Sequence, residues 1–122
     1  MPGLTNAESA ATLDARFPTS GATDHIAYSV NGTSEWAGLT RTPVGATGWA
    51  SATTADPSVK ANSGTLTSTA ATAAGTVTHY AIFSASTGGT QRTDWTALDS
   101  SKAVGVGDSV SWAATALKVT LT

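Results

Sequence analysis

A Gly-Asp-Ser-Val block at residues 107–110 is the pattern in this chain with the clearest catalytic potential. In some esterases the serine of such a block is the nucleophile, and it needs a histidine as base and hydrogen-bond donors for the oxyanion. An Asp-x-x-His pattern near the end of those enzymes supplies the base, and none follows the block here. Gly-Asp between two short strands is ordinary turn chemistry. We therefore predict no catalytic residue and no enzymatic activity.

The two histidines, His25 and His79, are the next candidates. Neither has an aspartate or glutamate at metal-ligand spacing, and the chain has no cysteine. Asp24 precedes His25 directly, so in a strand the two side chains would point to opposite faces. We predict no metal and no cofactor, and we expect each histidine to be hydrogen-bonded within a sheet or at a subunit contact.

Four tryptophans could bind sugars, because exposed indole rings on a β-sheet stack on sugar faces. The competing interpretation is that these rings fill a core made otherwise of small residues, and the sequence favours it. Carbohydrate binding is kept as the alternative. The four are Trp36, Trp49, Trp95 and Trp112.

The composition predicts a thin core and a surface that partners cover. Of 122 residues, 23 are Ala, 23 Thr, 14 Ser and 12 Gly, and 11% are charged. A soluble domain usually has about a quarter charged residues. Six Lys plus Arg and a net charge of -2 argue against nucleic acid as a partner. We also expect no membrane-spanning segment and no secretion signal. A Thr-rich β domain that is stable alone remains the alternative.

The N-terminal segment predicts a short helix that ends at Pro18. Thr5 and Glu8 form a capping box, and apolar residues then recur at spacings of three and four. Two roles stay open for this helix: an arm that docks on a neighbouring subunit, or a cover for one end of its own sheet. As an arm it would use Leu4, Leu13 and Phe17 as interface residues. We divide the chain into an arm and linker, residues 1–21, and a β domain, residues 22–122.

After Pro18 the apolar period changes to two, which is typical of strands with one buried face. Residues 25–30 predict the first strand, Asn31-Gly32 a tight hairpin turn, and residues 35–40 the returning strand. Residues 43–75 contain several Gly and Pro and give no clear assignment beyond short strands at 47–53 and 64–70.

The last third predicts a strand at 76–84, a turn at Gly88-Gly89, and later strands at 91–98, 109–113 and 117–121. Short strands joined by glycine turns indicate a mostly β chain, an antiparallel sandwich or barrel-like domain with a short N-terminal helix. The large residues of these strands are the predicted core: Tyr80, Ile82, Phe83, Trp95, Val110, Trp112, Leu117 and Val119.

Two blocks of the chain resemble a family of small virion proteins of tailed phages, variously labelled tail fibre, head fibre or capsid decoration proteins. They are GTVTHYAIFSASTGG, residues 75–89, and SKAVGVGDSVSWAA, residues 101–114. The resemblance implies a virion structural protein made in the host cytoplasm. The leading expectation is a decoration protein on the capsid surface, in contact with the major capsid protein or other virion proteins. It would be a homo-oligomer, possibly a trimer. The alternative is a minor tail or fibre protein, which a host-surface carbohydrate-binding role would fit.

Overall fold

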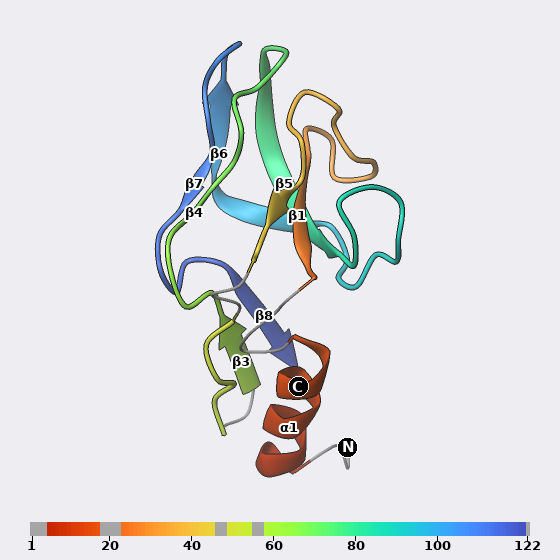
Figure 1. Ribbon diagram of the computed structural model, residues 1–122, viewed down its shortest axis with the longest axis vertical. Helices are drawn as coiled ribbons and strands as arrows, with labels where there is room; N and C mark the ends of the chain where they lie inside the picture. Colours follow the sequence, from red (N-terminus) through yellow and green to blue (C-terminus); the bar gives the residue numbers. More distant parts are fainter. Residues whose placement is uncertain (1–4, 18–22, 46–48, 55–57, 122) are drawn as a thin grey trace. The chain divides into compact units, whose positions relative to one another are not determined.

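The chain is mostly β, with antiparallel strand pairs and one short N-terminal helix, and this confirms the predicted fold class. Figure 1 shows the computed structural model, which describes residues 5–17, 23–45, 49–54 and 58–121. The elements in chain order are α1 (Asn6–Arg16), β1 (His25–Ser29), β2 (Thr42–Pro43), β3 (Ser58–Ala61), β4 (Leu66–Thr67), β5 (Gly75–Phe83), β6 (Thr96–Val104), β7 (Ser111–Trp112) and β8 (Lys118–Leu121).

The chain forms two compact units, and each is assembled from segments far apart in the sequence. Unit 1 comprises residues 1–22, 44–65 and 112–122, and unit 2 comprises residues 23–43 and 66–111. Helix α1 therefore shares a unit with β3 and β8, whereas the sequence predicted an arm, residues 1–21, beside a β domain.

Unit 2 is built on a four-stranded sheet in the order β2-β1-β5-β6. Strand β1 pairs with β5 along its whole length, from His25 opposite Phe83 to Ser29 opposite His79. The sequence predicted one apolar face for β1, but Ile26, Ala27, Tyr28 and Ser29 are all buried. Both faces of β1 are therefore covered, and its place between β2 and β5 pairs both of its edges as well.

The predicted hairpin at Asn31-Gly32 is wrong. Gly32 has a positive φ, but Asn31 does not, and the second strand of the sheet begins only at Thr42. The Asn31 side-chain oxygen instead accepts hydrogen bonds from the backbone N–H groups of Thr33, at 2.9 Å, and Ser34, at 3.0 Å. These bonds make an Asx turn, which competes with a two-residue hairpin for the same residues. Residues 30–41 thus form a long loop.

Trp36 fixes the middle of this loop by lying against two glycines. A Cβ atom added to Gly38 would lie 2.2 Å from the indole ring, and one added to Gly75 would lie 2.8 Å from it. The Trp36 backbone N–H also donates to the carbonyl oxygen of Tyr28, at 2.7 Å. The indole ring can occupy this place only because neither neighbour has a side chain.

Strand β6 is the terminal strand of the four-stranded sheet, and most of it is exposed on both faces. Only Val104 is buried and Leu98 half-buried, while the other seven residues are exposed. Its pairing with β5 is interrupted, since Val77 lies opposite Lys102 but His79 lies opposite Ala97. The sequence predicted this strand at residues 91–98. The connection after β5 is longer, and the strand extends to Val104.

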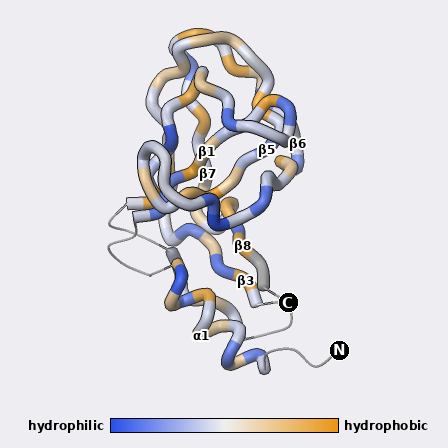
Figure 2. Tube along the Cα trace, turned by 90° about the vertical axis from the view of Figure 1, so that its right-hand side faces the viewer, coloured by the Kyte–Doolittle hydropathy of each residue, from blue (hydrophilic) through white to orange (hydrophobic). Residues whose placement is uncertain are grey.

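Unit 1 packs α1 against β3. Thr5 caps the helix by accepting a hydrogen bond from the Glu8 N–H, at 3.2 Å, as the sequence predicted. The buried side of the helix carries Ala10 and Leu13, and Figure 2 shows hydrophobic and hydrophilic residues alternating along its tube. Strand β3, which the sequence did not predict, pairs with β8.

The interface residues predicted on the helix are buried by their own chain. Leu13 and Phe17 are both among the buried hydrophobic residues, and the Phe17 ring meets Trp49 edge-on, with centroids 5.4 Å apart. This packing favours the second of the two roles, a helix that covers its own sheet. Leu4 lies outside the described residues.

The predicted core residues divide into two groups. The structure buries Tyr80, Ile82, Val110, Trp112 and Leu117. Phe83, Trp95 and Val119 are only partly buried. Phe83 lies at the end of its strand and Trp95 just before the next one, so each has one side turned away from the packed interior.

Candidate functional site

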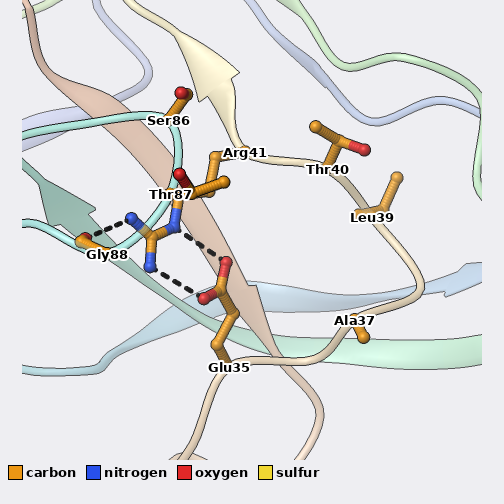
Figure 3. Close-up of a pocket in the computed structure, with 8 residues that line it drawn as sticks. All are labelled: Glu35, Ala37, Leu39, Thr40, Arg41, Ser86, Thr87 and Gly88. Carbon is orange, nitrogen blue, oxygen red and sulfur yellow. Dashed lines mark hydrogen bonds and ion pairs between the residues drawn. The ribbon is translucent and has the colours of Figure 1, made fainter.

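The loops of unit 2 form a pocket of about 310 Å³ beside Arg41. One wall comes from residues 35–41, the loop before β2, and the other from residues 86–88, the loop after β5, as Figure 3 shows. The lining residues are Glu35, Ala37, Leu39, Thr40, Arg41, Ser86, Thr87 and Gly88.

Arg41 joins the two walls. Its Nε and Nη2 atoms each donate to one oxygen of the Glu35 carboxylate at 2.9 Å, which makes a bidentate pair. Its Nη1 donates to the carbonyl oxygens of Ala85, at 3.0 Å, and Gly88, at 2.8 Å. Only 8% of the Arg41 side chain is exposed, against 33% for Glu35. The guanidinium of Arg41 therefore connects the two loops by hydrogen bonds, while part of the Glu35 carboxylate still faces solvent.

The loop after β5 is closed by its own hydrogen bonds. The Ser84 N–H donates to the carbonyl oxygen of Thr90, at 3.0 Å, and the Thr90 N–H donates to the Ser84 hydroxyl, at 2.8 Å. Gly88 and Gly89 both have positive φ, as expected for the predicted Gly-Gly turn. These bonds hold the backbone that presents Ser86 and Thr87 to the pocket.

The guanidinium lies on one aromatic ring, which in turn contacts a second. The Arg41 Cζ atom lies 4.0 Å from the centroid of the Phe83 ring, a cation–π contact. The Phe83 ring lies 6.0 Å from the ring of Trp95, centroid to centroid. Phe83 and Trp95 are partly exposed because Phe83 lies next to Arg41 and the surface pocket that it lines, and Trp95 lies next to Phe83.

The pocket has hydroxyl groups and a carboxylate but little net charge. Glu35 neutralises Arg41, and four of the five guanidinium N–H donors are already used by the carboxylate and the two carbonyls. The side chains of Thr40, Ser86 and Thr87 are exposed. The arrangement can therefore exchange hydrogen bonds with a neutral polar ligand but offers no free cation to an anion.

A second polar cluster lies in unit 1, where Lys60 of β3 is completely buried. Its Nζ atom lies 2.5 Å from an oxygen of Asp14 on α1, and that carboxylate also accepts the Ala52 N–H, at 2.9 Å. The hydrogen bond from Lys60, helped by that from Ala52, holds the pKa of Asp14 below its ordinary value. This pair connects the helix to the sheet and takes no part in the pocket.

The predicted turn role of the Gly-Asp-Ser-Val block fits the local geometry. Gly107 has a positive φ, and the Asp108 carboxylate accepts the Gly105 N–H, at 2.8 Å. The Nδ1 atom of His25 is hydrogen-bonded to the carbonyl oxygen of Thr23, at 2.7 Å, and that of His79 to the Thr78 hydroxyl, at 2.8 Å. In the described part of the chain neither histidine is hydrogen-bonded to Ser109. Within the described ranges, no three His, Cys, Asp or Glu residues come together as a potential metal site.

The tryptophans occupy two kinds of place. Trp49 and Trp112 are buried, as the core interpretation predicts, whereas Trp36 and Trp95 are partly exposed. The ring of Trp36 lies against two glycines and that of Trp95 against Phe83. None of the four rings lines the pocket.

Sequence reasoning missed the pocket because no local pattern marks it. Glu35 begins the segment predicted to be a strand, residues 35–40, and Arg41 follows its end. The loop carbonyls that Arg41 binds are more than forty residues further on. One signal was available. The chain has few charged residues, so an arginine in it is expected to pair with a carboxylate or a carbonyl oxygen.

The architecture defines a class of protein that is small and rich in β-strands, with one short helix at its N-terminal end. No helix in the part of the chain that the structure describes has the length and apolar character needed to cross a membrane. A search of curated proteins finds no match. The family described as Podophage GP4 fiber I protein gp80 matches residues 5–120, and the chain belongs to that family. It is therefore a phage fibre-type protein, a structural component of the virion.

Proposed function

We propose that this chain works as an assembled subunit of the phage particle, joined to further copies of itself through the edge of strand β6. The observation that carries the proposal is the exposure of β6. Seven of its nine residues are exposed, although strands of a stable sheet normally bury at least one face.

A free sheet edge presents unpaired backbone N–H and C=O groups, and proteins normally cover or charge such an edge. The exposed part of β6 carries one positive charge, Lys102, and one negative charge, Asp99, and its other exposed side chains are small. Interfaces have few charged residues at their centre, and small side chains let two backbones approach closely. A second copy of the chain is the occupant that these features fit.

The place of the assembly on the particle has two candidates. The family description supports a fibre. The low charge of the chain supports a capsid decoration protein, because such a protein buries part of its surface against the shell and interfaces have few charged residues at their centre. In that case its mechanism is mass action: binding only to the assembled shell lowers the free energy of that state.

Copy number per virion separates these locations. A decoration protein would be present in hundreds of copies and would protect heads from thermal disruption. A fibre subunit would be present in few copies, and antibodies would label a discrete appendage. Quantitative mass spectrometry of purified particles, with immunogold labelling, measures both.

We also propose that the protein has no enzymatic role. The support is the isolation of Ser109 from either histidine and the turn geometry around Asp108. The family description, that of a fibre protein, points the same way.

The assembly proposal predicts that Ala97→Lys combined with Ala103→Lys disrupts the oligomer. Both alanines are exposed on β6, so the change should leave the fold intact while it places like charges across the contact. Ala74→Lys, at an exposed position outside β6, is the matched control. Sedimentation velocity should show an oligomer for the parent and the control and a monomer for the double variant. A monomeric parent, or a double variant that still assembles, would refute the role of β6.

A further inference from the structure

We infer that the pocket beside Arg41 binds a neutral, hydroxyl-rich ligand of the saccharide class. This goes beyond the assembly role, and it depends on the loops of unit 2 and not on β6. The argument uses the charge of the pocket, the hydrogen-bonding groups that remain free to act, and the fixed position of the loops.

The charge of the pocket selects against anions. The only cation in the lining is Arg41, and its Nε and Nη2 atoms are paired with both oxygens of Glu35. Its Nη1 atom is bound to the carbonyl oxygens of Ala85 and Gly88. A phosphate or carboxylate would have to displace Glu35 and would meet its negative charge, so a neutral ligand fits better.

The remaining groups match a polyol. Each Glu35 oxygen accepts one hydrogen bond from Arg41, and a carboxylate oxygen has a second lone pair that can accept a ligand hydroxyl. The hydroxyls of Ser86 and Thr87 on the opposite wall can both donate and accept. Ala37 is exposed and adds an apolar part of the wall, which suits the C–H face of a sugar ring, while Leu39 beneath is almost fully buried.

The loops are held in place before a ligand arrives. Arg41 links both walls, its guanidinium lies on the Phe83 ring, and the loop after β5 is closed by the bonds between Ser84 and Thr90. Weak hydrogen bonds to a sugar give useful affinity only if few loop conformations are lost on binding. A shallow pocket whose loop backbones are held by these bonds meets that condition.

The test is a titration of the full chain with sugars, followed by amide chemical shifts in NMR spectra. The probes are glucose, galactose, rhamnose and N-acetylglucosamine as neutral ligands, with glucuronate and inorganic phosphate as anionic ones. We expect at least one neutral sugar to shift the amides of residues 35–41 and 84–90, and glucuronate to bind more weakly than glucose.

Thr87→Val removes one pocket hydroxyl while keeping the shape of the side chain. We expect it to weaken sugar binding by about tenfold, the value of one hydrogen bond left unmade. Thr69→Val, at an exposed threonine outside the pocket, is the matched control and should change nothing. Glu35→Gln removes the negative charge beside Arg41 and should strengthen the binding of phosphate relative to the parent.

Three results would each overturn the inference. They are no binding of any of the four neutral sugars, tighter binding of glucuronate than of glucose, or sugar-induced shifts that map outside both loops. An equal affinity in Thr87→Val and the parent would likewise remove the pocket from the interaction. A chain that assembles through β6 but binds no sugar would refute only this inference and leave the assembly proposal intact.

Discussion

In unit 1 the fully buried charge is a lysine, whereas in unit 2 it is an aspartate. Lys60 is 0% exposed and its partner Asp14 is 42% exposed. Asp24 is 1% exposed and its partner Arg92, at 3.0 Å, is 19% exposed. In each unit the chain buries one member of an ion pair and leaves the other closer to water, but the sign is reversed.

The elements that these pairs connect also differ. In unit 1 the pair links α1 to β3, so it joins two main elements of that unit. In unit 2 the sheet is held by an apolar interior that includes Ile26, Val77 and Ile82, and the ion pairs connect residues outside the strands. The difference teaches that a buried ion pair adds to the apolar packing between main elements in the first unit, whereas ion pairs connect loops in the second.

Removal of the lysine's partner should give the largest effect. Asp14→Ala leaves a buried ammonium without its carboxylate, and we expect it to destabilise the fold by about 3–5 kcal/mol. Lys60→Met keeps the apolar stem and leaves Asp14 free to be hydrated, so it should cost less than about 1.5 kcal/mol. Urea denaturation followed by Trp fluorescence measures both. Equal losses in the two variants would show that charge burial does not control unit 1.

In unit 2 the loss of a loop contact should cost less. Arg41→Lys keeps the charge but cannot reproduce the bidentate pair together with two carbonyl bonds, and we expect a destabilisation of about 1–2 kcal/mol. Hydrogen exchange should quicken in residues 84–90 and stay unchanged in β1 and β5. Thr40→Ser, at the neighbouring exposed position, is the control. Faster exchange throughout the sheet would contradict a role limited to the loops.

The smallest expected effect is on the pH dependence of stability: unit 1 should lose stability on the acid side and unit 2 on the alkaline side. The folded pKa of Asp14 is lowered, so its stabilising contribution is complete above the unfolded pKa of about 4 and is lost as pH falls below it. Burial, followed by the negative charge of Asp99, raises the pKa of Tyr80 in unit 2. The contribution of Tyr80 is therefore complete below the unfolded pKa of about 10 and is lost as pH rises above it.

Urea midpoints measured across pH test this assignment. Asp14→Asn should flatten the acid side of the curve and Tyr80→Phe the alkaline side. If Asp14→Asn instead changes only the alkaline side, the coupling of the carboxylate to folding has been misread.

The N-terminal helix and the strands expected at residues 76–84, 109–113 and 117–121 could be predicted, because their signals are local, whereas the strand expected at 91–98 lies at 96–104. The Thr5 cap precedes an apolar stripe, and residues 75–83 combine β-branched and aromatic residues in one run. The family resemblance came from the same region, and the match over residues 5–120 confirms it. Features that a few neighbouring residues determine are visible in a single sequence.

The missed features depend on residues that are distant in the chain. Lys60 lies 46 positions from Asp14, and nothing in the segment SVKA indicates that its lysine is buried. The Asn31-Gly32 pair is a strong hairpin signal, but the Asx turn and the packing of Trp36 override it. The pocket likewise depends on two loops, distant in the chain, that Arg41 connects.

The contact between Trp36 and its two glycines limits how this sequence can drift. A mutation at Gly38 or Gly75 to any residue with a Cβ would displace the indole ring, so it would be tolerated only together with a smaller residue at position 36. We therefore expect Trp36, Gly38 and Gly75 to be kept or replaced together in related sequences. Related chains that lack the tryptophan would then be free to vary at both glycines, and a designer who changes this loop must change all three positions at once.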